Sequence, residues 1–186
     1  IESNKYKEGP IIKLSEDLLW LGRKRSFQDK VENIDPHKQI TRSDVEVFKK
    51  NYTLKKKNLS SNFIRASQKI NSFFEGSLKT SEVFDSKKLA TFLAITDLIN
   101  ANHNLFWHNQ RFYFDPFSEL LIPIGFDGDA GRPLERLAID KPIHTINYFE
   151  DLEFIKLYVS ELERLSSSEY INNLFLKIYP EINKQL

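Results

Sequence analysis

Residues 92–131 read FLAITDLINANHNLFWHNQRFYFDPFSELLIPIGFDGDAG, and they form the most distinctive block of the chain. Residues 111–115 carry three aromatic side chains in a row, as β-strands favour. Residues 116–119 (PFSE) have turn chemistry, and residues 120–124 form an apolar run that suits a returning strand. The stretch therefore predicts a β-hairpin in the middle of the chain.

Helical signals dominate on both sides of the predicted hairpin, so we expect an α+β fold that is mostly helical. An apolar stripe from Phe63 to Phe74 predicts one helix, with Gly76 as its C-terminal stop. Asp85 suits the N-cap of a second, largely buried helix that ends near residue 100. Two helices, separated by the serines at 166–168, are expected to end the chain.

The N-terminal part of the chain gives weaker signals. An apolar run at residues 11–14 reads as a strand or linker that enters a short helix. Thr41 or Ser43 is suited to cap a further helix that runs through Val45 and Phe48.

Composition limits the class of protein. The net charge is +1, with 40% hydrophobic and 28% charged residues, which is typical of a globular domain. We expect no membrane span and no nucleic-acid partner, because no apolar run approaches roughly 18 residues and the overall charge favours neither. The densest basic stretch, Lys49–Lys57, is interpreted as a solvated helix face, with a nucleic-acid or acidic-lipid patch as the alternative.

The hairpin predicts which polar loops are neighbours. Antiparallel strands joined by a tight turn place the start of the first strand beside the end of the second. The polar loop before Arg111 and the acidic loop after Ile124 are therefore expected to meet. Five polar side chains are then gathered at one edge of a small sheet: Asn104, His108, Asn109, Asp127 and Asp129.

Phosphoryl transfer uses such a group of side chains. Asp and Asn oxygens hold Mg²⁺, and a carboxylate orients the attacking hydroxyl. Protein kinases carry H-R-D-L-x-x-x-N, then a hairpin, then D-F-G. Here the step from Asn104 to Asn109 has the kinase length, and Asp127-Gly128 follows the hairpin. Asn109 and Asp127 are thus candidate metal ligands, with Asp129 in reserve; the alternative is that these residues only make turns.

The stretch 92–131 resembles the signature block of the spore-coat CotH kinase family. KEGPIIKLSED (7–17) resembles the segment that joins that family's two lobes, and EFIKLYVSELERLSSSEYINNLF (153–175) resembles its closing helical pair. The resemblance implies the C-lobe of a bacterial, protein-kinase-like fold that uses ATP with Mg²⁺ or Mn²⁺, often outside the cytoplasm or at the cell surface. Residues 1–40 would then be a linker after a small lobe expected upstream, and residues 41–186 the helical lobe, with catalytic-type loops at 101–131.

The resemblance assigns roles by position. Asn104 takes the catalytic-Asp position, Asn109 the loop-Asn position and Asp127 the metal-Asp position. Asn104 departs from the family's Asp, and Gly125 from the first Asp of its acidic motif. Because an amide cannot take up the hydroxyl proton as a carboxylate does, the leading hypothesis is a weakened or inactive kinase that binds ATP and Mg²⁺.

Two alternatives stay open. One is an active Ser/Thr protein kinase in which His103 or His108 replaces the base, although both histidines are also interpreted as loop hydrogen-bonding groups. The other is a structural or partner-binding domain that has lost nucleotide binding. The expected ligands are a nucleotide and a protein substrate or partner.

Overall fold

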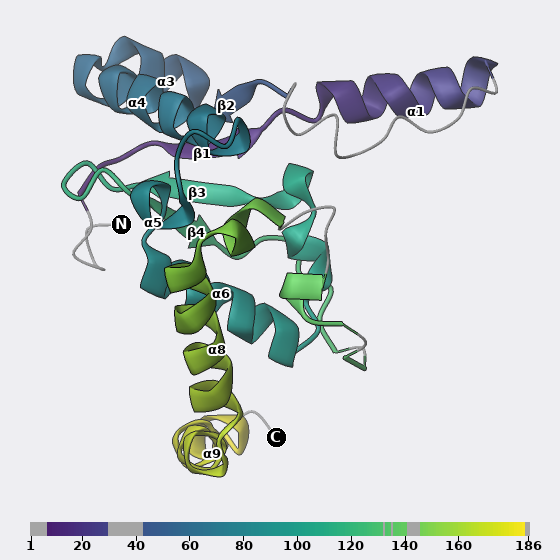
Figure 1. Cartoon of the computed structure of the whole chain (residues 1–186), viewed down its shortest axis with the longest axis vertical. Coiled ribbons are helices and arrows are strands. Elements are labelled where there is room, and N and C mark those ends of the chain that lie inside the picture. The colour runs from purple at the N-terminus through teal and green to yellow at the C-terminus, as the bar shows by residue number, and fades with distance from the viewer. Residues whose placement is uncertain (1–6, 30–42, 132, 135, 141–145, 185–186) are drawn as a thin grey trace.

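The computed structural model describes residues 7–29, 43–131, 133–134, 136–140 and 146–184. One antiparallel sheet lies among helices, with its strands in the order β2–β1–β3–β4 (Figure 1). The strands are β1 (Ile11–Leu14), β2 (Val45–Val47), β3 (Arg111–Phe114) and β4 (Leu121–Ile124). The helices are α1 (Asp17–Asp29), α3 (Lys50–Lys55), α4 (Lys57–Phe74), α5 (Thr80–Val83), α6 (Ser86–Leu98), α8 (Leu152–Ser166) and α9 (Ser168–Ile182), with the short 3-10 helices η2 (Asn102–Leu105), η3 (Trp107–Asn109), η4 (Ala138–Asp140) and η5 (Ile146–Glu150). The prediction of an α+β, mostly helical fold is confirmed.

Strands β3 and β4 form the hairpin that the sequence predicts. Their register runs from Arg111 opposite Ile124 to Phe114 opposite Leu121. In the turn, the Asp115 carboxylate accepts hydrogen bonds from the Phe117 N–H at 3.2 Å and the Ser118 hydroxyl at 2.8 Å. The side chain of Asp115 thus fixes the connection, as Asp does in tight turns.

The helix expected through Val45 and Phe48 is wrong. Residues 45–47 form strand β2, which pairs with β1 through Ile12 opposite Val47 and Leu14 opposite Val45. Two β-branched residues within three positions favour a strand when a partner strand is available. Thr41, one of its two proposed caps, lies outside the described residues.

The ends of the central helices follow the sequence signals. Helix α4 ends before Gly76, which has a φ of 75° and so takes the left-handed conformation of a C-terminal stop. Asp85 caps α6 by accepting a hydrogen bond from the Lys88 N–H at 3.1 Å. Helix α6 is less buried than expected, because Ile95 and Leu98 are exposed on its outer face.

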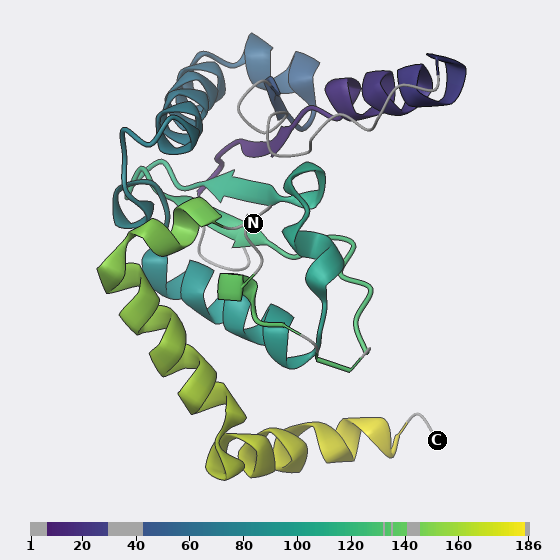
Figure 2. The same cartoon turned by 45° about the vertical axis from the view of Figure 1, so that its right-hand side comes forward.

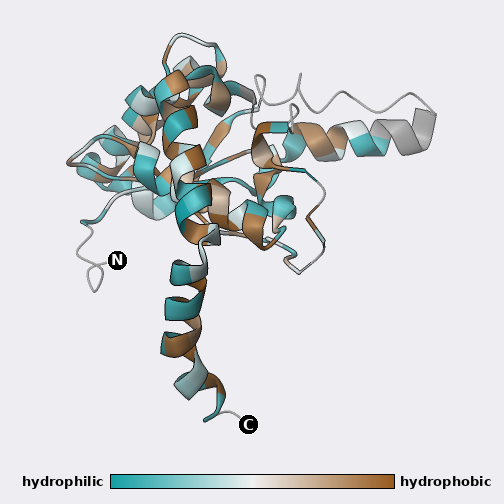
Figure 3. Ribbon diagram, turned by 60° about the horizontal axis from the view of Figure 1, so that its bottom comes forward, coloured by the Kyte–Doolittle hydropathy of each residue, from teal (hydrophilic) through white to brown (hydrophobic). Residues whose placement is uncertain are grey.

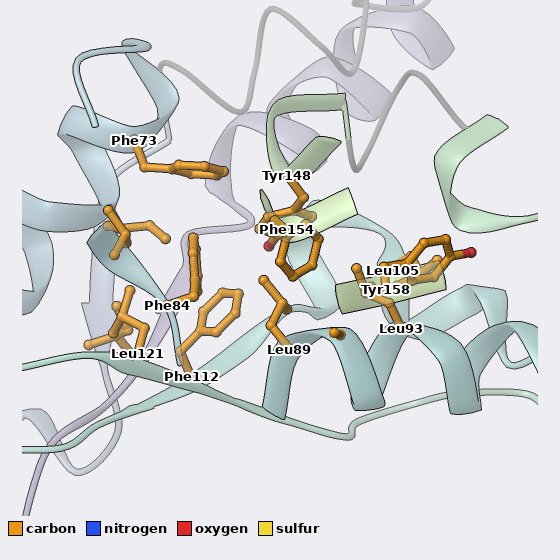
Figure 4. Packing of buried hydrophobic residues seen from close by; sticks show 14 of the residues in the cluster. Phe73, Phe84, Leu89, Leu93, Leu105, Phe112, Leu121, Tyr148, Phe154 and Tyr158 are labelled. Carbon is orange, nitrogen blue, oxygen red and sulfur yellow. The ribbon is translucent and has the colours of Figure 1, made fainter. Parts of the chain in front are cut away.

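The core lies between the sheet, α4, α6 and α8 (Figure 4). Its centre is aromatic: the Phe84 ring meets the Phe73 ring edge-on at 5.0 Å and the Tyr148 ring edge-on at 5.3 Å, and also contacts Phe112. Leu89 and Leu93 of α6 complete this cluster. Aromatic pairs in such geometries add roughly 0.5–1.5 kcal/mol each beyond the burial of their surface. The core therefore holds one face of the hairpin rigidly in place.

Helices α1 and α9 extend away from the core (Figures 1 and 2). The expected strand entering a helix is confirmed as β1 and α1, and β1 lies inside the sheet between β2 and β3. The two C-terminal helices are confirmed as α8 and α9, with Ser167 capping α9 through its hydroxyl. Helix α9 buries none of its residues, and its ribbon, partly coloured as hydrophobic, projects from the body of the fold (Figure 3). Among the described helices, none has the length and apolar character to cross a membrane.

Candidate functional site

The candidate site lies where two loops meet at the open end of the hairpin. We call residues 101–110 the first loop and residues 125–131 the second loop. The first loop folds into η2 and η3, while the second has no regular secondary structure. Because Arg111 pairs with Ile124, the two loops leave the sheet at the same end, as the sequence predicts.

Three polar side chains converge between the loops: Asn109, His103 and Asp127. The Asn109 Nδ2 donates to the His103 carbonyl oxygen at 3.0 Å and lies 3.4 Å from Asp127 Oδ2. His103 Nδ1 lies 3.1 Å from Asp127 Oδ2 and 3.1 Å from the Asp127 carbonyl oxygen. Asn109 Nδ2, a donor, also lies 3.2 Å from His103 Nδ1, so this nitrogen faces two acceptors and one donor, and a proton on Nδ1 satisfies the contacts with Asp127 and leaves Nε2 as an acceptor. The expected proximity of Asn109 and Asp127 is confirmed.

The convergence is accessible on one side and anchored on the other. The side chains of His103 and Asp127 are 43% and 52% exposed, whereas Asn109 is only 5% exposed. A ligand can therefore reach the carboxylate and the imidazole directly, while the amide forms the base of the site.

The backbone of the second loop is shaped for this close approach. Asp127 has a φ of 53° and Asp129 a φ of 47°, a left-handed conformation that Asp tolerates better than most residues. A Cβ added to Gly128 between them would lie 3.2 Å from the Cβ of Ala101. Gly128 thus allows the second loop to lie directly on the first.

Asn104 is placed differently from what a catalytic side chain requires. It is 7% exposed, and its Nδ2 and Oδ1 lie 3.2 Å and 3.4 Å from the Thr96 hydroxyl on α6. Its Nδ2 would lie 3.8 Å from a Cβ on Gly128, so the amide sits beneath the second loop. Its assignment to the catalytic-base position stays a prediction.

His108 and Asp129 are less closely joined to the convergence. The His108 ring stacks on Phe106 with a centroid distance of 5.7 Å, and Phe106 in turn meets the His103 ring edge-on at 5.2 Å. Burial holds the pKa of His108 below its usual value, against the opposing charge of Glu16. Asp129 is exposed two residues beyond Asp127.

Sequence reasoning missed Arg111 and Phe126 as neighbours of the site. Arg111 is 5% exposed, and its guanidinium lies 4.5 Å from the centroid of the half-exposed Phe126 ring. Its Nη1 donates to the His108 carbonyl oxygen at 2.6 Å, and its nearest described carboxylate is Glu16 at 3.7 Å. Burial lowers the pKa of the guanidinium, which nevertheless stays charged. A charged residue at the start of an aromatic strand, directly after the polar loop, was the available signal.

The donor set suits a hard divalent cation held with a phosphate ligand. No three His, Asp or Glu side chains surround a common point within the described ranges. Mg²⁺ is commonly bound by one or two carboxylates, with water and substrate phosphates completing its shell. Asn109 directs its Nδ2 to both the His103 carbonyl oxygen and Asp127 Oδ2, so its amide would have to turn over for the Asn109 oxygen and the Asp127 carboxylate to share a cation. The residue types present therefore fit a divalent cation once two contacts of Asp127 have rearranged, the one with the Asn109 amide nitrogen and the one with His103.

Comparison of the chain with family models, with curated proteins and with solved structures found no match. The resemblance to the CotH kinase family therefore stays a prediction that rests on the block at residues 92–131.

Proposed function

We infer that this chain is a kinase-like domain that binds ATP together with Mg²⁺ or Mn²⁺ and transfers phosphate slowly or not at all. The observation that carries the proposal is the approach of Asn109 Nδ2 to within 3.4 Å of Asp127 Oδ2 at the open end of the hairpin. Protein kinases hold their metal ions in this way, with an Asn in the loop before a hairpin and an Asp in the loop after it.

The weak activity follows from the nature of the first loop. The resemblance assigns Asn104 to the position from which a carboxylate would accept the substrate proton, but an amide cannot accept it, and this amide is buried against Thr96. A positioned general base contributes about a hundredfold to ten-thousandfold to a rate. Binding of the nucleotide needs no such base, so binding and catalysis separate in this proposal.

The bound cation would supply charge neutralisation for the nucleotide phosphates. Asp127 would hold it through its carboxylate, and Asn109 through its amide oxygen. His103 Nδ1 lies 3.1 Å from Asp127 Oδ2, so the imidazole holds the carboxylate in its direction.

Thermal unfolding with ATP, with and without Mg²⁺ or Mn²⁺, tests the proposal. A ligand at about 100 times its Kd adds about 2.7 kcal/mol to the free energy of unfolding, which raises Tm by several degrees for a chain of this size. We expect a shift only with ATP and cation together. Asp127→Ala should abolish it, while Glu163→Ala, which removes an exposed carboxylate on α8, should leave it unchanged. An undiminished shift in Asp127→Ala would remove that residue from the site.

A second candidate is an active Ser/Thr kinase with His103 as its base. It is favoured by the contact of His103 Nδ1 with Asp127, because the tautomer that donates from Nδ1 leaves Nε2 of this partly exposed ring as an acceptor for a hydroxyl proton. Radiolabelled ATP with a generic protein substrate separates the candidates. Brisk transfer that is lost in His103→Ala, or in His108→Ala, supports a substituted base. Neither transfer nor ATP binding would favour a partner-binding domain that has lost its nucleotide.

A further inference from the structure

A hollow of about 710 Å³ opens at the opposite end of the hairpin from the candidate site. It is lined by the residues just before β1, by the start of α4 and by the hairpin turn: Lys7, Glu8, Lys56, Lys57, Asn58, Leu59 and Pro116. Pro116 belongs to the turn, whereas Asn109 and Asp127 flank the other end of β3 and β4. The hollow is therefore a separate feature of the surface.

Positive charge dominates this hollow. Lys56 Nζ lies 3.2 Å from Glu8 Oε1, so these two side chains balance each other. Lys7 and Lys57 add two further positive charges, and Lys57 makes no ion pair with any part of the chain that the structure describes. Helix α4 begins at Lys57 with no acidic residue in its first turn and no side-chain cap. The helix dipole therefore adds to the positive potential of the lysines.

The hollow also has an organised, partly apolar floor. Leu59 is 5% exposed and, with Pro116, provides apolar surface between the lysines. The Tyr52 hydroxyl donates to Glu8 Oε1 at 2.7 Å and accepts from Lys56 Nζ, so three side chains hold one another in position. These hydrogen bonds, first that of Tyr52 and then that of Lys56, lower the pKa of Glu8 and keep it ionised.

We propose that this hollow binds an acidic peptide segment of a protein partner. Carboxylates of the peptide would pair with Lys7 and Lys57, and an apolar side chain would pack on Leu59 and Pro116. Charge complementarity of this kind selects partners and raises association rates.

The chemistry of the hollow favours a peptide over the other polyanions. Glu8 is an acceptor among the lysines, which suits a peptide, because a peptide spaces its carboxylates and offers N–H groups, whereas a nucleic acid brings a continuous run of phosphates. A membrane surface would meet the rim of a concave site and leave its floor uncovered. A purely ionic ligand would leave the apolar surface of Leu59 and Pro116 without a contact.

Fluorescence anisotropy with a labelled peptide of alternating glutamate and leucine tests this proposal. We expect saturable binding that weakens as salt is added. Lys57→Glu should weaken it about tenfold or more, because it reverses a charge inside the hollow. Lys50→Glu is the matched control: Lys50 is exposed in the same basic stretch but does not line the hollow, so the loss should stay below about threefold.

Lys7→Gln, outside any helix, gives a second variant with an expected loss of about threefold to tenfold. Circular dichroism confirms that each variant is folded. Equal losses in Lys57→Glu and Lys50→Glu would overturn the proposal, since they would indicate diffuse attraction. Absence of peptide binding at low salt would also overturn it, as would tighter binding of a single-stranded oligonucleotide or of phosphatidylserine vesicles.

Discussion

The first loop and the second loop meet at one end of the hairpin, yet they are built in opposite ways. Trp107 and Leu105 of the first loop are 1% and 2% exposed, so this loop has the burial of a core element. In the second loop, Phe126 is 47% exposed and the Asp127 side chain 52%. From this difference we infer that the first loop would position the candidate site and the second would present it to a ligand. Stability and ligand binding should then respond to different substitutions.

Buried hydrogen bonds strengthen the structural role of the first loop. Gln110 Nε2 donates to the Leu105 carbonyl oxygen at 2.9 Å, and the Tyr148 hydroxyl donates to Gln110 Oε1 at 2.8 Å. The loop is thereby tied both to itself and to η5. Leaving any one of these buried groups without a partner would cost about 1–3 kcal/mol.

The largest effect is expected from Trp107→Ala. Removal of a fully buried indole should lower the free energy of unfolding by about 3–5 kcal/mol, measured by urea denaturation followed by circular dichroism. Phe126→Ala in the second loop is the control and should cost less than about 1.5 kcal/mol, because that ring is half-exposed and rests mainly on Arg111. Similar losses of unfolding free energy in both variants would show that the two loops do not differ in their contribution to stability.

Gly128→Ala tests the contact between the loops. The added Cβ would lie 3.2 Å from the Cβ of Ala101, so we expect a cost of about 1–3 kcal/mol in thermal unfolding, with weaker ATP-dependent stabilisation. Gly125→Ala is the matched control, because its nearest neighbour, Phe92, would be 3.8 Å away in ordinary contact. Equal stability of the two variants would show that the loops do not need this close approach.

Asn104→Asp tests whether the first loop still carries the catalytic position. If the rest of the site is intact, phosphotransfer should rise at least about tenfold, equivalent to about 1.4 kcal/mol of barrier. The radiolabelled assay described above measures it, and Asn102→Asp, which adds the same charge to the same loop, should give no increase. Because Asn104 is buried against Thr96, a loss of stability should accompany the change. No rise in rate with ATP binding retained would remove Asn104 from the catalytic position.

The smallest effect is expected from Asp129→Asn. Asn tolerates the left-handed φ of 47°, and the site is exposed, so stability should change by less than about 0.5 kcal/mol. The cation-dependent shift in Tm with ATP should persist here and disappear in Asp127→Asn. A lost shift in Asp129→Asn would extend the metal ligands along the second loop.

The sequence correctly predicted those features of the fold that depend on residues close together in the chain. Asp85 as a cap, Gly76 as a stop and the hairpin at 111–124 are all set by residues within a few positions of one another. Val45 in a strand is the contrasting case. Its strand exists because β1 lies beside it, and the pairing partner is more than thirty residues away in the chain.

For the candidate site, too, the sequence predicted some contacts and missed others. The proximity of Asn109 and Asp127 followed from the hairpin register alone. The burial of Asn104 against Thr96 did not, because the spacing of loop residues does not show which side chain faces a helix. The pairing of Lys56 with Glu8 was likewise hidden, since it joins distant segments across the fold.

The central place of β1 has a consequence for the order of folding. Ile12 pairs with Phe112, roughly 100 residues further along the chain, and closing a loop of that length costs about 4 kcal/mol of chain entropy. The β3–β4 hairpin is local and can form early, whereas β1 must wait until β3 has been synthesised. During translation, Ile12 therefore lacks its partner Phe112 until β3 has been made, although β1 can already pair with β2.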